Sequence, residues 1–362
     1  MPGIVDVARK AGVSITTVSR TFNPVIEYPV APATRQRVLA AAAALQYSPS
    51  ALARALVTRR SRIVGVLVGD IVDPYFAEIA RGIEDVARRA GYLVIVCNTS
   101  RDPGTERRYI SALRDYRADA IMFLGGDIFD EASRRALERD MVAVTRLGTV
   151  AVGVAGDRVG LPAFDIDHAA AAEEMTRYLV GLGHRDIGFI GGLPSVSTAR
   201  QRLAGFRAGM AAAGLSSDRL EPADFTYAGG YTAALRMLEA PRPTAIFAAN
   251  DQMALGALAA CRRAGVEVPT DMTVVGFGNT AAAEHAVPAL STVAMPRHQL
   301  GVEAMQAVLD ALAVESTAVR GRRLPFYLVI RESSSGPPTS VGRKARRASA
   351  PAPRRGTDRV RS

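Results

Sequence analysis

Seven short apolar runs, separated by helical stretches, constrain the fold of this chain more than any other feature of its sequence. The runs are rich in β-branched residues and begin at residue 63, and stretches such as FAEIARGIEDVARRAG lie between most of them. This alternation predicts parallel β-sheets with crossover helices on both faces. Because there are too many such units for one comfortable sheet, we expect two α/β lobes. The runs are IVGVLV, YLVIVC, AIMFL, VAVGV, IGFIGG, AIFAA and TVVGF.

The first 45 residues follow a different, purely helical pattern. Residues 4–23 (IVDVARKAGVSITTVSRTFN) read as two short helices joined at Gly12, where glycine adopts a positive φ without steric cost. Ser14 is suited to cap the second helix, which we expect at 15–22. The residues spaced to pack these two helices together are Ala8, Ala11 and Val18.

A third helix, expected at about 33–45, would close a small core. The two helices within residues 4–23 could form a helix-turn-helix, which can lay its second helix in the major groove of DNA. For two short helices taken alone, an ordinary helical hairpin is the alternative. The core residues expected from the third helix are Val38, Leu39, Ala42 and Leu45.

The net charge of +10 is concentrated at the two ends of the chain. Residues 1–61 contain eight basic and two acidic residues, and residues 336–362 contain eight basic residues and one acidic residue, so the part between is mildly acidic. Positive charge clustered on a small domain indicates a phosphate-backbone partner. The segment after Glu332 is rich in Ser, Pro, Gly and Arg, which predicts disorder, and 336–362 form a basic tail that either attracts DNA or only solubilises the chain.

The sequence contains none of the common catalytic or cofactor motifs. It has no GxSxG, P-loop or HExxH motif, and GFIGG lacks the GxGxxG spacing. The four histidines lie far apart, and Cys97 and Cys261 are expected to be core thiols. No apolar run is long enough to span a bilayer, and the N-terminus lacks a signal-peptide pattern. We therefore expect no catalytic residue, metal, cofactor or membrane partner, and a cytoplasmic location.

An ordered set of motifs resembles the LacI/GalR family of bacterial transcription regulators, from about Ile4 to Glu332. The order of the motifs makes the resemblance specific. It implies a helix-turn-helix head and an α/β body of two doubly wound parallel-sheet lobes, of the periplasmic-binding-protein type. The motifs are DVARKAGVSITTVSRTFN, TRQRVLAAAAALQYSPSALARAL, VDPYFAEIARGIEDVARRAGY, GHRDIGFIGG, STARQRLAGFRAGM, PTAIFAANDQMALGAL and DMTVVGFGNT.

The resemblance also suggests where the domains begin and end. The final strand, LPFYLVI, is expected in the second lobe. The expected parts are a DNA-binding head at 1–48, a hinge helix and linker at 49–61, a first lobe at about 62–162 and 291–323, a second lobe at about 163–290 and 324–335, and the tail at 336–362.

In the family, the start of the recognition helix faces base edges, which here implies Ile15, Thr16 and Arg20. Arginine can grip the O6/N7 edge of guanine, and the methyl groups of Ile or Thr can touch thymine methyls. Phosphate contacts fix register rather than sequence. Thr17 and Ser19 are expected at phosphates, but they could equally be neutral residues on the helix surface. The residues expected to contact phosphates are Ser14, Thr17, Ser19 and Asn23.

The run SALARAL, residues 50–56, is too short to be stably helical alone in water. By resemblance it is the hinge helix, which folds when two copies meet on DNA. Leu56 then wedges into the minor groove and kinks the duplex, although an ordinary packing leucine is the alternative. Ala53 belongs to the same DNA-contacting helix. The arginines expected to reach phosphates are Arg54, Arg59 and Arg60.

An effector cleft is expected at the carboxyl ends of the strands, where open α/β sheets bind ligands. In the family, aromatic residues at these positions face a sugar ring, and Arg or Asp groups bind its hydroxyls. For Asn250 and Asp251, capping of the following helix is about equally expected. The residues implied are Tyr75, Phe76, Arg202, Phe225, Asn250 and Asp251.

The chain departs from the family pattern at two places. Gly278 and Asn279 replace the usual acidic pair after the last apolar run, and His168 follows Asp167 where the family tends to have Asn. Because the acidic pair is lost, a hydroxyl acceptor is missing. We expect a sugar or sugar derivative, but a purine, a sugar phosphate, an acidic sugar or no effector remain open.

Together these features predict a homodimeric, sequence-specific regulator, most simply a repressor, that binds a pseudo-palindromic double-stranded operator. Its affinity for DNA would be set by a small molecule, expected to be a carbohydrate, between the lobes. A solute-binding protein or a derived enzyme that uses the α/β body is the alternative. The basic helical head counts against that alternative.

Overall fold

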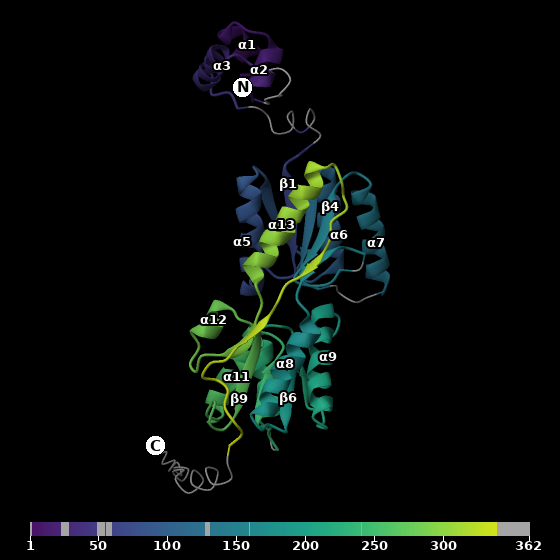
Figure 1. The fold of residues 1–362 in the computed structure, drawn as a ribbon, viewed down its shortest axis with the longest axis vertical. Coiled ribbons are helices and arrows are strands. Elements are labelled where there is room, and N and C mark those ends of the chain that lie inside the picture. The colour runs from purple at the N-terminus through teal and green to yellow at the C-terminus, as the bar shows by residue number, and fades with distance from the viewer. Residues whose placement is uncertain are drawn as a thin grey trace, which may run out of the picture.

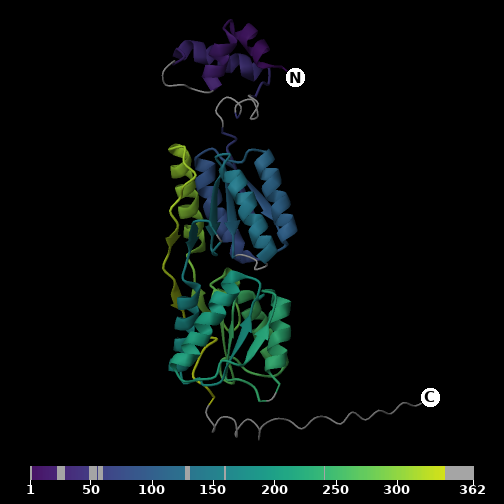
Figure 2. The same ribbon diagram turned by 90° about the vertical axis from the view of Figure 1, so that its right-hand side faces the viewer.

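A computed structural model shows a helical head and two α/β lobes arranged along one axis (Figures 1 and 2). The head lies beyond the end of the first lobe, and the second lobe lies at the far side of the first. The structure describes residues 2–22, 29–48, 55, 60–126, 131–158, 160–239 and 241–338.

The head consists of α1 (Ile4–Ala11), α2 (Ile15–Phe22) and α3 (Pro32–Ala44). Gly12 ends α1 with a φ of 65°, as its sequence position predicts. The prediction for Leu39 is wrong, because its side chain is 40% exposed. Ala42 is buried as predicted, and Ala41, three positions after Val38 on the same helix face, belongs to the core in place of Leu39. The buried core residues are Val7, Ala8, Ala11, Val18, Val38, Ala41 and Ala42.

The sheet of the first lobe has six parallel strands in the order β11-β5-β4-β3-β1-β2. Both of its faces are buried: Val64 and Val66 belong to the apolar cluster that includes α5, and Leu67 to the cluster beneath α6 and α7. The strands are β1 (Ile63–Val68), β2 (Leu93–Asn98), β3 (Ala120–Leu124), β4 (Val150–Val154), β5 (Ala163–Asp165) and β11 (Arg322–Arg323), and the helices are α5 (Pro74–Arg89), α6 (Pro103–Asp115), α7 (Glu131–Thr145) and α13 (Arg297–Ala313).

The sheet of the second lobe has the order β12-β10-β9-β8-β6-β7. Its strands are parallel except β12, which is antiparallel to β10. Helices α8 and α9 pack together, as do α10 and α11. The strands are β6 (Ile187–Gly191), β7 (Leu220–Pro222), β8 (Ala245–Ala248), β9 (Thr273–Gly278), β10 (Ser291–Ala294) and β12 (Tyr327–Val329), and the helices are α8 (His168–Gly181), α9 (Ser197–Ala212), α10 (Tyr227–Met237), α11 (Asp251–Arg263) and α12 (Ala281–Glu284).

Two of the expected lobe boundaries are wrong. The strand β5, at 163–165, belongs to the first sheet rather than the second lobe, and β10, at 291–294, belongs to the second sheet rather than the first lobe. The chain therefore crosses after residue 165 and returns after residue 294. These short strands lie beside the crossings, where their apolar pattern does not reveal which sheet they join. The last crossing lies between β11 and β12, as expected.

Helices α5 and α13 of the first lobe touch backbone to backbone. A Cβ atom on Gly82 would overlap the carbonyl oxygen of His298, and one on Gly301 would overlap that of Ile79. Glycine is needed at both positions because no side chain fits between the two helices. This close contact fixes the start of α13, which carries Arg297, beside the cleft.

Ser333 and Ser335 are ordered parts of the second lobe, contrary to the disorder that their composition predicts. Val274 N donates to Ser333 O at 3.0 Å, and Ser335 N donates to Thr273 Oγ1 at 3.0 Å. A ring nitrogen of His184, Nε2, lies 2.7 Å from Ser335 O. These bonds attach the segment after β12 to the start of β9 and to His184. Most of the predicted basic tail, residues 339–362, lies outside the described residues.

Candidate DNA-contacting helix and interlobe cleft

Helix α2 begins with the predicted cap. Ser14 Oγ accepts a hydrogen bond from Thr17 N at 3.1 Å and lies 2.9 Å from Thr17 Oγ1. Val18 and Thr21 are buried against the head, whereas Ile15 is 47% exposed and Thr16 is exposed beside it. The start of α2 therefore presents apolar and hydroxyl groups to the outside, as contact with base edges requires.

The remaining predicted DNA contacts divide into described and undescribed residues. Ser19 and Arg20 are half-buried on α2. Arg60 Nη2 donates to the carbonyl oxygen of Leu312 at 2.7 Å, so this side chain contacts the end of α13, in contrast to the phosphate contact expected for it. The predictions that lie outside the described residues concern Asn23, Ala53, Arg54, Leu56 and Arg59.

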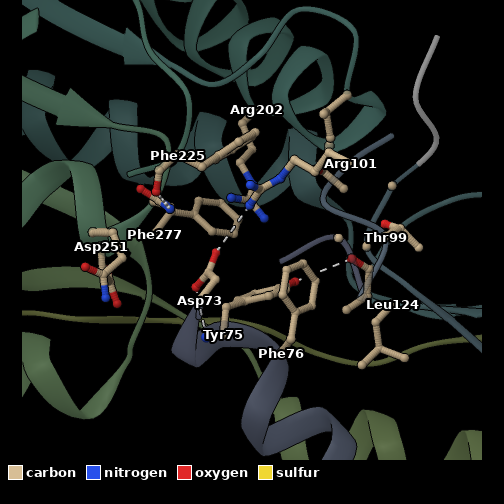
Figure 3. A pocket seen from close by; sticks show the side chains of 18 of the residues that line it. Asp73, Tyr75, Phe76, Thr99, Arg101, Leu124, Arg202, Phe225, Asp251 and Phe277 are labelled. Carbon is tan, nitrogen blue, oxygen red and sulfur yellow. Dashed lines mark hydrogen bonds and ion pairs between the residues drawn. The ribbon is translucent and has the colours of Figure 1, made fainter. Parts of the chain in front are cut away.

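A cavity of about 70 Å³ lies between the lobes, at the carboxyl ends of strands from both sheets (Figure 3). This is room for several water molecules. Residues from both lobes form its wall, and the small volume indicates that the lobes stand close together. The predicted effector-binding residues that line it are Tyr75, Phe76, Arg202, Phe225, Asn250 and Asp251.

The aromatic residues of the first lobe enter the cleft from the start of α5. Asp73 caps this helix by accepting from Tyr75 N at 3.0 Å, and Pro74 follows as its first residue. The Tyr75 and Phe76 rings meet edge to face with centroids 5.2 Å apart. Tyr75 Oη lies 3.4 Å from Ala155 O, and burial raises the pKa of this phenol. The phenol therefore stays protonated and can donate a hydrogen bond.

Phe225 and Asn250 are joined across the second lobe. Phe225 has a φ of 69°, a conformation that bulky side chains rarely adopt and that is typically held in place by its surroundings. Asn250 Nδ2 donates to Phe225 O at 2.9 Å, and Asn250 Oδ1 accepts from Met253 N at 2.9 Å. Asn250 is thus the cap of α11, as the alternative interpretation of its position predicts, and it also fixes the Phe225 turn.

Asp251 lines the cavity, but its carboxylate is occupied by other groups of the chain. Oδ2 accepts from Thr280 N at 2.6 Å and from Thr280 Oγ1 at 3.0 Å, and Oδ1 accepts from Thr292 Oγ1 at 2.6 Å. Burial, the largest influence, raises the pKa of this carboxyl. Asp251 therefore holds the segments after β9 and in β10 in place at the floor of the cleft.

Arg202 is buried at 4% exposure and stacks on Phe277, with its guanidinium carbon 4.0 Å from the ring centre. Its Nη1 donates to Ala249 O at 2.6 Å, and its Nε lies 3.4 Å from His168 Nδ1. Burial lowers the pKa of Arg202. Residue His168, one of the departures from the family pattern, is therefore a neighbour of the cleft arginine.

The other departure, Gly278 and Asn279, is held by two arginines. Arg297, which is buried, donates to the carbonyl oxygens of both residues and also contacts Glu78 Oε2 at 2.8 Å. Arg331 Nη2 donates to Asn279 Oδ1 at 2.8 Å. The Asn279 amide oxygen is thus engaged outside the cleft.

Several cleft residues were missed in the sequence analysis. Arg101 follows the carboxyl end of β2, so the rule that located Tyr75 would also have found it. Phe277 lies inside an apolar strand, and its role is visible only because Arg202 stacks on it. Glu106 and Arg158 are far apart in the sequence, and nothing in the sequence pairs them. The missed residues are Asp73, Arg101, Glu106, Arg158, Thr198 and Phe277.

Metal-ligand clusters and helices able to cross a membrane are both absent from the described parts of the chain. Among these residues, no cluster of three His, Cys, Asp or Glu side chains is arranged to hold a metal ion. No helix in the same ranges is long and apolar enough to cross a membrane.

Comparisons with known proteins cover both the head and the body. The model of bacterial regulatory proteins of the lacI family matches residues 3–50, and that of the periplasmic binding protein-like domain matches residues 176–334. The HTH-type transcriptional regulator DegA of Bacillus subtilis (strain 168) is 34% identical over 334 residues, which cover 92% of this chain and 98% of DegA.

Solved structures match over the same extent. The lac repressor dimer bound to operator and the anti-inducer ONPF has a TM-score of 0.80 at 27% identity and covers 92% of this chain and 99% of its own. The complex of the transcriptional regulator CelR with cellobiose has a TM-score of 0.67 at 30% identity and covers 92% and 100%. These matches include head and body together, which favours a regulator over a solute-binding protein or an enzyme. The chain belongs to the LacI family of bacterial transcriptional regulators.

Proposed function

We propose that this protein is a cytoplasmic repressor that binds a pseudo-palindromic operator as a homodimer. A small molecule bound between its lobes raises or lowers its affinity for that operator. The observation that carries this proposal is the exposed, Ser14-capped start of α2 in the same chain as an interlobe cleft. A two-fold dimer presents two such helices, which matches two half-sites of a palindrome.

For the contacts with DNA, we assign base edges to Ile15, Thr16 and Arg20. Arg20 is the single charged side chain of α2, and arginine discriminates guanine through two hydrogen bonds. Ser14, Thr17, Ser19 and Asn23 are assigned to phosphates. In the hinge segment at 49–61, we assign Leu56 to the minor groove, with Ala53 and Arg54 beside it. A short hinge helix is marginal alone, so DNA and the spacing of the lobes can both shift its folding.

For the effector, the related structures support a carbohydrate or a derivative of one, because CelR was solved with cellobiose. Tyr75, Phe76 and Phe225 offer aromatic faces to C–H groups, and Arg202 offers a fork of donors to oxygens. Asn250 and Asp251 shape the cleft through the bonds that they make within the second lobe. The body that holds the effector spans 62–335, with lobes divided after 165 and after 294 rather than at the boundaries expected from sequence.

The test is a search for operators by genome-wide footprinting, followed by fluorescence anisotropy with the full-length protein. A bound fragment should contain inverted half-sites, and scrambling one half-site should weaken binding, because each mismatched base pair costs about 1–3 kcal/mol. A fragment with both half-sites scrambled is the control for nonspecific attraction. Equal binding to the intact and scrambled fragments would contradict the proposal.

A further inference from the structure

The acidic groups of the cleft already have partners. Glu106 accepts from Arg158 Nη1 at 2.8 Å and from Nη2 at 3.1 Å, in a pair that is almost wholly buried. Asp251 accepts three hydrogen bonds from Thr280 and Thr292. The carboxylates at these two places are thus satisfied within the protein and are poorly available to the hydroxyl donors of a neutral sugar.

The position where the family usually carries an acidic pair adds no acceptor. Gly278 has no side chain, and the Asn279 amide oxygen accepts from Arg331 instead of facing the cavity. The second lobe therefore contributes mainly donors to the cleft. Its strongest donor is Arg202, which is buried, stacked on Phe277 and bonded to a carbonyl oxygen and a histidine nitrogen.

No carboxylate within the described ranges forms an ion pair with Arg202. A buried guanidinium without an anionic partner is costly, because it has lost its hydration without gaining a counter-charge. Asp165 and Asp73 lie near enough to influence Arg202 electrostatically, but Asp165 contacts His168 Nε2 at 3.1 Å and Asp73 accepts a hydrogen bond from Tyr75 N. Among the three arginines that line the cavity, Arg101 and Arg158 form ion pairs, whereas Arg202 forms none with the described residues.

Arg101 brings a second guanidinium to the same cavity from the first lobe. Ser100 and Arg101 have φ values of 53° and 55°, so the turn after β2 uses two consecutive left-handed residues to aim this side chain inward. The Arg101 guanidinium lies 5.7 Å from the centre of the Phe225 ring and contacts Asp70 at 3.3 Å and Asp73 at 3.9 Å. Figure 3 shows Arg101 and Arg202 both projecting into the pocket, with Asp73 below them.

We propose that the effector carries an oxyanion, a carboxylate or a phosphate, that binds between Arg101 of the first lobe and Arg202 of the second. The inference rests on the proposed function, since it assigns a charge to the ligand of that cleft. An oxyanion accepts the donor forks of both arginines and provides the counter-charge that Arg202 lacks. Because the two arginines come from different lobes, the anion also links the lobes. Neutral sugars offer no such counter-charge.

The test compares acids with their neutral parents on the full-length protein. Glucose is paired with glucuronate and glucose 6-phosphate, and ribose with ribose 5-phosphate, by isothermal titration at low and high salt. At least one acid should bind on the order of tenfold more tightly than its parent, as expected for hydrogen bonds to a charged group. Its affinity should fall with salt, because the attraction is ionic. Glucuronate distinguishes a carboxylate from the phosphate esters.

Variants locate the effect. Arg101→Gln should lower the ratio of acid to parent affinity severalfold, because Arg202 alone then contacts the anion, and Arg101→Lys should restore part of it. Arg88→Gln is the matched control, because Arg88 forms an exposed ion pair with Glu84 on the same lobe, outside the cavity, and it should leave the ratio unchanged. The assignment is overturned if no acid binds more tightly than its parent, or if Arg101→Gln keeps the full preference.

Operator binding without ligand is measured in parallel. A protein that binds its operator but prefers neutral sugars refutes the anionic effector and leaves the proposed regulator intact. A protein that binds the acid but no specific DNA refutes the proposed function instead.

Discussion

Removing one partner of the ion pair between Glu106 and Arg158 should strongly destabilise the first lobe, although replacing both partners by apolar residues should not. Both side chains are less than a tenth exposed, and both terminal nitrogens of Arg158 contact the carboxylate. The guanidinium also lies 5.0 Å from the centre of the Phe123 ring. In Glu106→Leu, the charge of Arg158 remains buried while this carboxylate is gone. Breaking a buried pair in this way costs about 3–5 kcal/mol.

Replacing both partners by apolar residues of similar size should recover most of that loss. The variant Glu106→Leu with Arg158→Met removes the two charges together, so neither desolvated group is left behind. The coupling energy from the double-mutant cycle, which also needs the single variant Arg158→Met, should therefore approach the sum of the two single losses. Additive losses would mean that the two side chains act independently, contrary to the geometry.

Thermal melting followed by circular dichroism measures these effects. A loss of 1 kcal/mol lowers the melting temperature of a domain of this size by about 3–4 °C, so Glu106→Leu should lower it by about 10 °C or more. Arg107→Gln is the control, because Arg107 pairs with Asp140 at the surface and is half-exposed. That exposed pair is worth at most about 1 kcal/mol. A melting temperature of Glu106→Leu equal to that of the control would refute the reasoning.

Three further predictions concern the head, the hinge and the second lobe. Arg20→Ala should weaken operator binding by about 1–3 kcal/mol and relax base preference at one position per half-site, whereas equal weakening on nonspecific DNA would indicate a phosphate contact. Leu56→Ala should leave the melting temperature unchanged and reduce operator affinity and DNA bending, whereas a loss of about 2–5 kcal/mol in stability would identify a core residue. Burial lowers the pKa of His184, so the unfolded chain binds its proton first, and the free energy of unfolding should fall as pH drops below 6.5, the ordinary value. His184→Gln should flatten that dependence in pH-dependent urea titrations.

Much of the head could be predicted from sequence because its signals are local. The range of α2, its Ser14 cap and the Gly12 turn all depend on residues within four positions of one another. The prediction for Leu39 failed because the residue directly after the buried Val38 lies on another face of the helix, whereas Ala41, three positions after Val38, shares its face and was not predicted.

The cleft was located correctly because parallel strands bring their carboxyl ends to one edge, whatever the details of packing. The bonds inside the cleft could not be predicted in the same way. Asp251 is held by Thr280 and Thr292, which are 29 and 41 residues away in sequence. A sequence pattern shows that a carboxylate lies near a strand end, but only the folded structure shows which groups donate hydrogen bonds to it.

These long-range bonds also connect the floor of the cleft to the first lobe. Asp251 fixes Thr280, and the carbonyl oxygens of the two preceding residues, Gly278 and Asn279, accept hydrogen bonds from Arg297. Arg297 in turn starts a helix that packs on α5 of the first lobe. The contact between Arg297 and Glu78 lies within the first lobe, whereas its contacts with the two carbonyl oxygens cross between the lobes. Rotation of one lobe against the other must therefore break the second set of contacts and spare the first. A ligand that favours one arrangement by about 1–3 kcal/mol is sufficient for regulation. The two hydrogen bonds from Arg297 to the second lobe are therefore an element that a ligand in the cleft can bias.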